Sequence, residues 1–130
     1  YKARKDINAI VHSHAVWSSA FAITGKNIPP VLAEQALFLG GETVCAEYGK
    51  VGSWELANNM VKALGEKRMA ALLRNHGAIS CGGDLETALS FQSFLEKGAQ
   101  TVVMAKLLGD ILEVAPDNVL DDSLNDLPWD

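Results

Sequence analysis

The feature that most constrains this chain is the segment 10–14, IVHSH, an apolar run that contains two histidines two positions apart. Its β-branched residues favour a strand, and side chains two positions apart on a strand project from the same face. We therefore expect His12 and His14 to lie side by side at the end of a strand. The remaining histidine, His76, stands in a similar setting, shortly after the apolar run 70–73.

All three histidines thus lie at the ends of strand-like segments, where α/β sheets present functional groups. Three neutral imidazoles that leave a fourth position to water or substrate form a catalytic zinc site. Such an ion polarises a carbonyl as a Lewis acid and needs a separate proton-transfer group. The alternative is that each histidine is a satisfied core or loop residue, since the residues alone do not place His76 beside the other two.

Four further residues offer weaker functional candidates. Cys45 and Cys81 have no CxxC spacing, so we interpret them as reduced, buried small hydrophobes. Tyr48, in a predicted loop, is either a proton donor or a packing residue. Glu34, in a mainly apolar segment, either faces a site or occupies a solvated helix position, and the second reading is favoured.

Strand-like and helix-like segments alternate along the chain, which predicts an α/β domain. Ser53 and Asp84 are expected N-caps, and Gly65 suits the end of a helix. The expected strands are 10–14, 43–46, 69–73 and 78–81, and the expected helices are 15–23, 31–39, 54–64 and 85–108.

Apolar periodicity predicts which helix faces are buried. In the third helix the buried stripe is Leu56, Met60 and Leu64, widened by Val61. In the fourth helix the expected stripe is Leu85, Leu89, Phe91, Leu95, Ala99, Val102, Val103, Ala105 and Leu107. Core or subunit-contact positions are expected for Trp17, Trp54, Phe91 and Phe94.

Composition limits the function classes. The 130 residues correspond to one ordinary domain, and a net charge of −5 without a basic cluster argues against nucleic-acid and membrane-surface partners. No apolar stretch approaches the roughly 20 residues of a spanning helix, and no signal-peptide pattern opens the chain, so we expect a cytoplasmic protein. The acidic segment after Asp110 still offers Leu120, Leu124 and Trp129 for docking.

Several motifs in a fixed order resemble the class II aldolase/adducin head family, which includes fuculose-phosphate aldolase and ribulose-phosphate 4-epimerase. The residues that carry the resemblance are Tyr1, Arg4 and the segments 6–14, 28–30, 40–41, 52–57 and 75–82. The similarity extends over nearly all of the chain up to about Gly109.

The resemblance implies an αβα-layered domain whose central sheet is mainly antiparallel. It implies Zn²⁺ or another divalent metal held by His12, His14 and His76, and a homotetramer with the site near a subunit boundary. The implied reaction is retro-aldol cleavage of a small sugar phosphate or related hydroxy-carbonyl compound through a metal-stabilised enediolate. Alternatives within the family are a sugar-phosphate 4-epimerase and a dehydratase.

The sequence also departs from the family pattern. In the aldolases the catalytic glutamate lies upstream of the position that matches Tyr1, and the phosphate-binding loops lie further upstream. A tyrosine that some members place after the proline segment is not matched by 31–34, VLAE. We therefore expect residues 1–130 to be the C-terminal portion of a longer class II aldolase-like domain, with its general base unassigned. A non-catalytic, adducin-like assembly module is the remaining alternative, which the three retained histidines disfavour.

Overall fold

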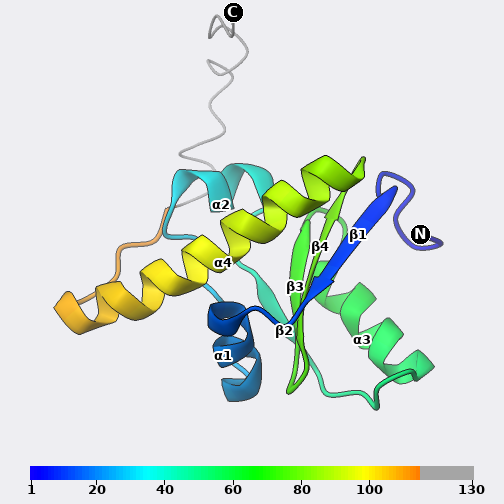
Figure 1. Ribbon diagram of the computed structural model, residues 1–130, viewed down its shortest axis with the longest axis horizontal. Coiled ribbons are helices and arrows are strands. Elements are labelled where there is room, and N and C mark those ends of the chain that lie inside the picture. Colours follow the sequence, from blue (N-terminus) through cyan, green and yellow to red (C-terminus); the bar gives the residue numbers. More distant parts are fainter. Residues whose placement is uncertain (115–130) are drawn as a thin grey trace, which may run out of the picture.

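The secondary structure follows the predicted alternation of strands and helices. A computed structural model describes residues 1–114 (Figure 1), so the acidic segment with Leu120, Leu124 and Trp129 lies outside the described residues. The elements are β1 (Ala9–Ser13), α1 (Val16–Thr24), α2 (Ala33–Phe38), β2 (Val44–Ala46), α3 (Trp54–Leu64), β3 (Ala70–Leu73), β4 (Gly77–Gly82) and α4 (Leu85–Leu108). Every predicted element is present, and only the ends of some differ from expectation.

Helix ends match their local signals closely. The Ser53 hydroxyl accepts a hydrogen bond from the Leu56 N–H, and the Asp84 carboxylate accepts one from the Thr87 N–H. Gly65 follows α3 with a left-handed φ of 58°. The two hydrogen bonds at Ser53 and Asp84 satisfy amide groups that the start of a helix leaves without an intrahelical partner.

The strands form one sheet in the order β1-β4-β3-β2. β4 runs antiparallel to both β1 and β3, whereas β2 runs parallel to β3. β3 and β4 are joined by the short turn 74–76, and α3 provides the longer connection that a parallel pair requires. The sheet is therefore mainly antiparallel, as the resemblance implied and contrary to what strand–helix alternation alone suggests.

Helices cover both faces of the sheet, with α3 on one side and α1, α2 and α4 on the other (Figure 1). The central strand β3 shows why, because its successive side chains point to opposite faces. Ala70 and Leu72 belong to the core beneath α1, α2 and α4, and Ala71 and Leu73 belong to the core beneath α3. Both faces of β3 are buried, which explains its uninterrupted apolar sequence.

The predicted burial of α3 is confirmed for Leu56, Met60 and Leu64, which join the core on that side. Val61 is 38% exposed, so its assignment to the stripe was wrong. It lies five positions after Leu56, about 140° around the helix, and so stands beside the buried stripe and partly in solvent.

The predicted stripe of α4 was wrong at its ends. The buried stripe steps by four and three residues through Ala88, Gln92, Leu95, Ala99 and Val102. Leu85, Leu89 and Leu107 are exposed. Leu89 lies about 100° from Ala88 around the helix, and the last turn extends beyond the sheet (Figure 1).

The large aromatic residues divide between core and surface. Trp17, Phe91 and Phe94 pack against the core beneath α1, α2 and α4. Trp54 is 80% exposed at the start of α3, so it is not a core residue. No helix among residues 1–114 is long and apolar enough to cross a membrane.

Candidate metal centre

His12 lies near the end of β1, and its ring is oriented by the neighbouring strand. Its Nδ1 is 3.0 Å from the carbonyl oxygen of Ala78 in β4. A carbonyl oxygen only accepts hydrogen bonds, so the ring donates its Nδ1–H. In a neutral imidazole this leaves the lone pair on Nε2, which is the arrangement of a metal-ligating histidine whose second nitrogen is held by a carbonyl.

His14 follows β1 and precedes α1, and it lies beside His12 as the strand period predicts. The Nε2 atoms of the two rings are 3.1 Å apart. Two nitrogen ligands of one tetrahedral Zn²⁺ lie roughly 3.3 Å apart, given Zn–N bonds of about 2.0–2.1 Å. The observed separation therefore fits two ligands of one ion, without requiring a different backbone.

His76 reaches the same place through the tight turn between β3 and β4. Asn75 adopts a left-handed φ of 56°, a conformation that Asn tolerates better than most residues. The Asn75 N–H donates to the Ala22 carbonyl at 3.2 Å, which fastens the turn to α1. Gly77 leaves no room for a side chain, because a Cβ there would lie 2.7 Å from Cδ2 of His14.

The His76 ring is more buried than the other two. Its Nδ1 is buried and has no hydrogen-bond partner among the described residues. Burial, and secondarily the positive charge that His12 and His14 carry when protonated, lowers the pKa of His76 below its ordinary value. The ring is therefore neutral at pH 7, which is the form that binds metal.

The three rings form a nearly equilateral triangle. Their centroids are 4.9 Å apart for His12 and His14, 4.8 Å for His12 and His76, and 5.1 Å for His14 and His76. One nitrogen from each ring lies within 4.8 Å of the other two. The donor set has the ligand type and the spacing of a three-histidine metal site with an open position.

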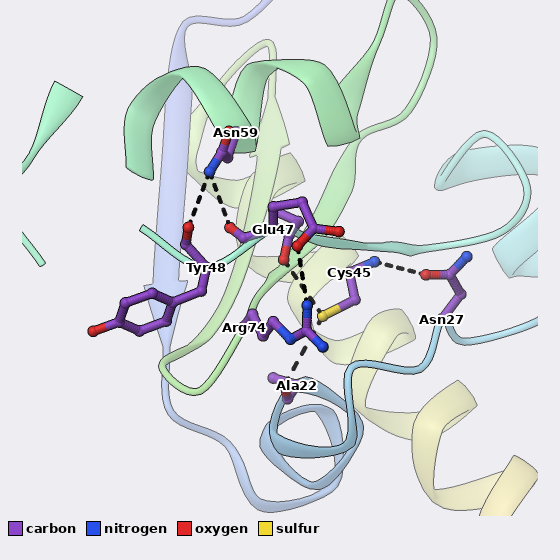
Figure 2. A network of polar contacts seen from close by, with 8 residues as sticks. Ala22, Asn27, Cys45, Glu47, Tyr48, Asn59 and Arg74 are labelled. Atoms are coloured by element: carbon purple, nitrogen blue, oxygen red, sulfur yellow. Dashed lines mark hydrogen bonds and ion pairs between the residues drawn. The ribbon is translucent and has the colours of Figure 1, made fainter. Parts of the chain in front are cut away.

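Glu34 and Tyr48, two of the weaker functional candidates, take part in other contacts. Glu34 forms an ion pair with Lys97 at 2.8 Å, and this hydrogen bond lowers the pKa of its carboxyl. Figure 2 shows the Tyr48 ring pointing away from a polar network that it joins through its backbone carbonyl, which accepts from Asn59. The Tyr48 side chain is 57% exposed.

The two cysteines are free thiols, and Cys81 is buried as expected, whereas Cys45 is only half-buried. Burial raises the pKa of Cys81 to about 11. Burial also raises the pKa of Cys45, which lies in the network of Figure 2, where its amide donates to the Asn27 side chain at 2.9 Å. Neither thiol is activated as a nucleophile or metal ligand.

Sequence reasoning missed Glu96, a residue of α4 whose carboxylate accepts hydrogen bonds from the Trp17 and Ser18 amides. The signal that was available is the start of α1, where Ala15 has no side chain able to cap a helix. A helix without a local cap requires one from elsewhere in the fold or from solvent.

Comparison with known proteins gives one consistent result. Residues 1–103 match the family profile described as Class II Aldolase and Adducin N-terminal domain. Over 117 residues the chain is 36% identical to the L-fuculose phosphate aldolase of Escherichia coli (strain K12), a match that covers 90% of this chain and 54% of that protein. It is 32% identical over 110 residues to the 5-deoxy-D-ribulose 1-phosphate aldolase of Bacillus thuringiensis serovar kurstaki, covering 85% and 51%.

Solved structures agree with the sequence relatives. A structure of L-fuculose 1-phosphate aldolase superimposes with a TM-score of 0.86 at 31% identity, covering 92% of this chain and 55% of that one. The l-fuculose-1-phosphate aldolase from Thermus thermophilus superimposes with a TM-score of 0.66 at 25% identity, covering 83% and 57%. The chain spans about half the length of the curated relatives that it matches.

Proposed function

Because this chain belongs to the Class II Aldolase and Adducin N-terminal domain family, we propose that it is the metal-binding portion of an aldolase that cleaves a small sugar phosphate. The convergence of His12, His14 and His76 carries this proposal. The names of the relatives support the substrate class, since those proteins are aldolases of fuculose phosphate and of 5-deoxyribulose 1-phosphate.

The three histidines are the proposed ligands of Zn²⁺ or another divalent metal. When bound, such an ion supplies Lewis-acid polarisation of the substrate carbonyl and stabilises the negative charge that develops on its oxygen. His12 is held in one tautomer by the Ala78 carbonyl, which keeps its Nε2 lone pair available. Burial lowers the pKa of His76, which favours the neutral ring that a metal ion requires.

Proton transfer needs a further group within hydrogen-bond reach of the substrate. Glu34 is engaged with Lys97, and the exposed Tyr48 ring points away from the polar network of Figure 2. We therefore place the general base in the half of the relatives that this chain does not match. In this proposal residues 1–130 are the C-terminal portion of a longer class II aldolase-like domain, which assembles as a homotetramer.

Metal content is the first test. The purified chain should bind close to one Zn²⁺ per molecule by elemental analysis after removal of excess metal. His76→Ala, and the double variant His12→Ala/His14→Ala, should each lose the bound ion. Gln100→Ala changes an exposed position of α4 and serves as the control. Equal zinc in the histidine variants and in the control would contradict the proposed ligands.

An activity assay tests the proposed aldolase reaction. The complete protein that contains this chain should release dihydroxyacetone phosphate from L-fuculose 1-phosphate or 5-deoxy-D-ribulose 1-phosphate, and the zinc-free His76→Ala variant should not. Product analysis separates aldol cleavage from 4-epimerisation and dehydration, which leave the carbon chain intact. Zinc binding without any of these reactions would favour a non-catalytic assembly module instead.

A further inference from the structure

Helix α1 begins immediately after His14, yet its own sequence does not cap it. The N-cap residue Ala15 makes no side-chain hydrogen bond, and the first turn contains no acidic residue. The first amides of a helix have no intrahelical partner and need one from elsewhere. The start of α1 is therefore fixed by whatever supplies these hydrogen bonds.

Glu96 supplies them from α4, 78 residues further along the chain than Ser18. One carboxylate oxygen accepts from the Trp17 N–H at 2.6 Å, and the other accepts from the Ser18 N–H at 2.9 Å. Hydrogen bonds to a carboxylate are stronger than neutral ones, and negative charge is favoured at a helix N-terminus. Because the two bonds go to consecutive amides, they define both the position and the direction of this helix end.

The other end of α1 is joined to the turn that carries His76. The Ala22 carbonyl accepts from the Asn75 N–H at 3.2 Å. Helix α1 thus has His14 directly before its N-terminus and the residue preceding His76 bonded to its last turns. A displacement of α1 along or about its axis would change the separation of the two histidine-bearing segments.

We propose that Glu96 is a positioning residue of the metal centre, which sets the placement of His14 and His76 through α1. This inference rests on the proposed function, in which these histidines are metal ligands. Residues that hydrogen-bond directly to metal ligands alter metal affinity by about 10- to 100-fold when they are changed, and Glu96 acts one step further out, through α1. Glutamine would keep one acceptor oxygen and bring its NH₂ group against the second amide, so it should retain only part of the effect.

The test compares Glu96→Ala and Glu96→Gln with two control variants in the 130-residue chain. Glu66→Gln removes the same charge at an exposed turn, and Gln100→Ala changes an exposed position of the same helix. Zn²⁺ affinity is measured by competition with a chelator, at a temperature well below every unfolding midpoint. We expect Glu96→Ala to raise the Kd about tenfold, Glu96→Gln to raise it less, and both controls to stay within about twofold of wild type.

Two spectroscopic readouts separate positioning from simple helix stabilisation. The visible absorption of the Co²⁺-saturated protein reports the ligand geometry, and ¹H–¹⁵N correlations of the His14 and His76 rings report their surroundings without metal. Both should change in the Glu96 variants and not in the controls. Glu96 variants with a lower unfolding midpoint but wild-type Zn²⁺ affinity, cobalt spectrum and ring signals would overturn the inference.

Failure of the proposed function would look different, because wild type itself would bind no Zn²⁺. The ¹H–¹⁵N signals of the His14 and His76 rings in the metal-free protein then test whether Glu96 positions these residues. A shift of both His14 and His76 signals in Glu96→Ala would support positioning through α1, and unchanged signals would refute it.

Discussion

The Nε2 atoms of His12 and His14 face each other at 3.1 Å, and the Nδ1–H of His12 is already donated to the Ala78 carbonyl. In the neutral rings only His14 can donate between the two Nε2 atoms. A metal ion bound between the two rings would use the lone pairs of both Nε2 atoms. This pair of atoms therefore forms two of the three donors of the candidate metal centre.

Zinc should stabilise the fold through this arrangement. At a free concentration one hundred times its Kd, a ligand that binds only the folded state adds about 2.7 kcal/mol to the free energy of unfolding. For a domain of this size the expected rise in Tm is about 10 °C, measured by differential scanning fluorimetry. His76→Ala should abolish the rise; a rise of the same size in that variant would show that zinc binds elsewhere.

Gly77→Ala should damage both stability and metal binding. Its Cβ would meet the Ser13 carbonyl oxygen and would lie 2.7 Å from Cδ2 of His14, so the end of β1 would have to move. The expected loss is about 1–3 kcal/mol in the free energy of unfolding, measured by urea denaturation, together with weaker zinc binding. Gly83→Ala is the matched control, because nothing lies within 4 Å of a Cβ there, and it should change stability by less than about 0.5 kcal/mol.

Gly98→Ala should destabilise the contact between α2 and α4. A Cβ at position 98 would overlap the Gln35 side chain, whose oxygen accepts from the Val31 and Leu32 amides at 3.0 and 3.1 Å. We expect a loss of about 1–3 kcal/mol in the free energy of unfolding.

The background variant Gln35→Ala supplies the control for that prediction. With the overlapping side chain removed, Gly98→Ala should become neutral or stabilising, because Ala is favoured over Gly in a helix by about 1 kcal/mol. Equal destabilisation by Gly98→Ala in both backgrounds would contradict the contact between Gln35 and Gly98.

Both cysteines should react slowly with thiol reagents in the native protein, and Cys81 should be the slower. A pKa of about 11 leaves Cys81 with roughly one thiolate in a thousand at pH 8, and its side chain is fully buried. Modification by 5,5′-dithiobis(2-nitrobenzoate) should accelerate greatly in denaturant. Rapid native reaction of a Cys45→Ala variant would contradict the burial of Cys81.

Acid should weaken the attachment of the first residues to the segment between α3 and β3. The hydrogen bond from Arg4 lowers the pKa of Asp6 from 3.8 to about 2, and Arg4 also donates to the Gly65 and Arg68 carbonyls. A lowered carboxyl pKa stabilises the fold above pH 3.8, and this contribution is lost as the pH falls toward 2. Asp6→Asn should therefore reduce the change in urea midpoint between pH 4.5 and pH 2.5. Asp110→Asn, at an exposed position, should leave that change as in wild type.

Local signals predicted most of the elements. The bounds of α3 and α4, with caps at Ser53 and Asp84, follow from hydrogen bonds between residues close in sequence. The pairing of His12 with His14 likewise follows from the two-residue period of a strand. The wrong assignments, Val61 in α3 and Leu85, Leu89 and Leu107 in α4, concern which side of an element faces the sheet.

Local sequence patterns did not predict the contacts between segments that are distant in the sequence, and only the tertiary structure shows them. The sequence by itself determined that residues 10–14 present two imidazoles on one face, because that depends on backbone geometry within five residues. Only the packed sheet, with β4 between β1 and β3, brings His76 to them, and only the packing of α4 on α1 brings Glu96 to the start of that helix. Such contacts depend on how whole layers pack, and no local periodicity encodes that.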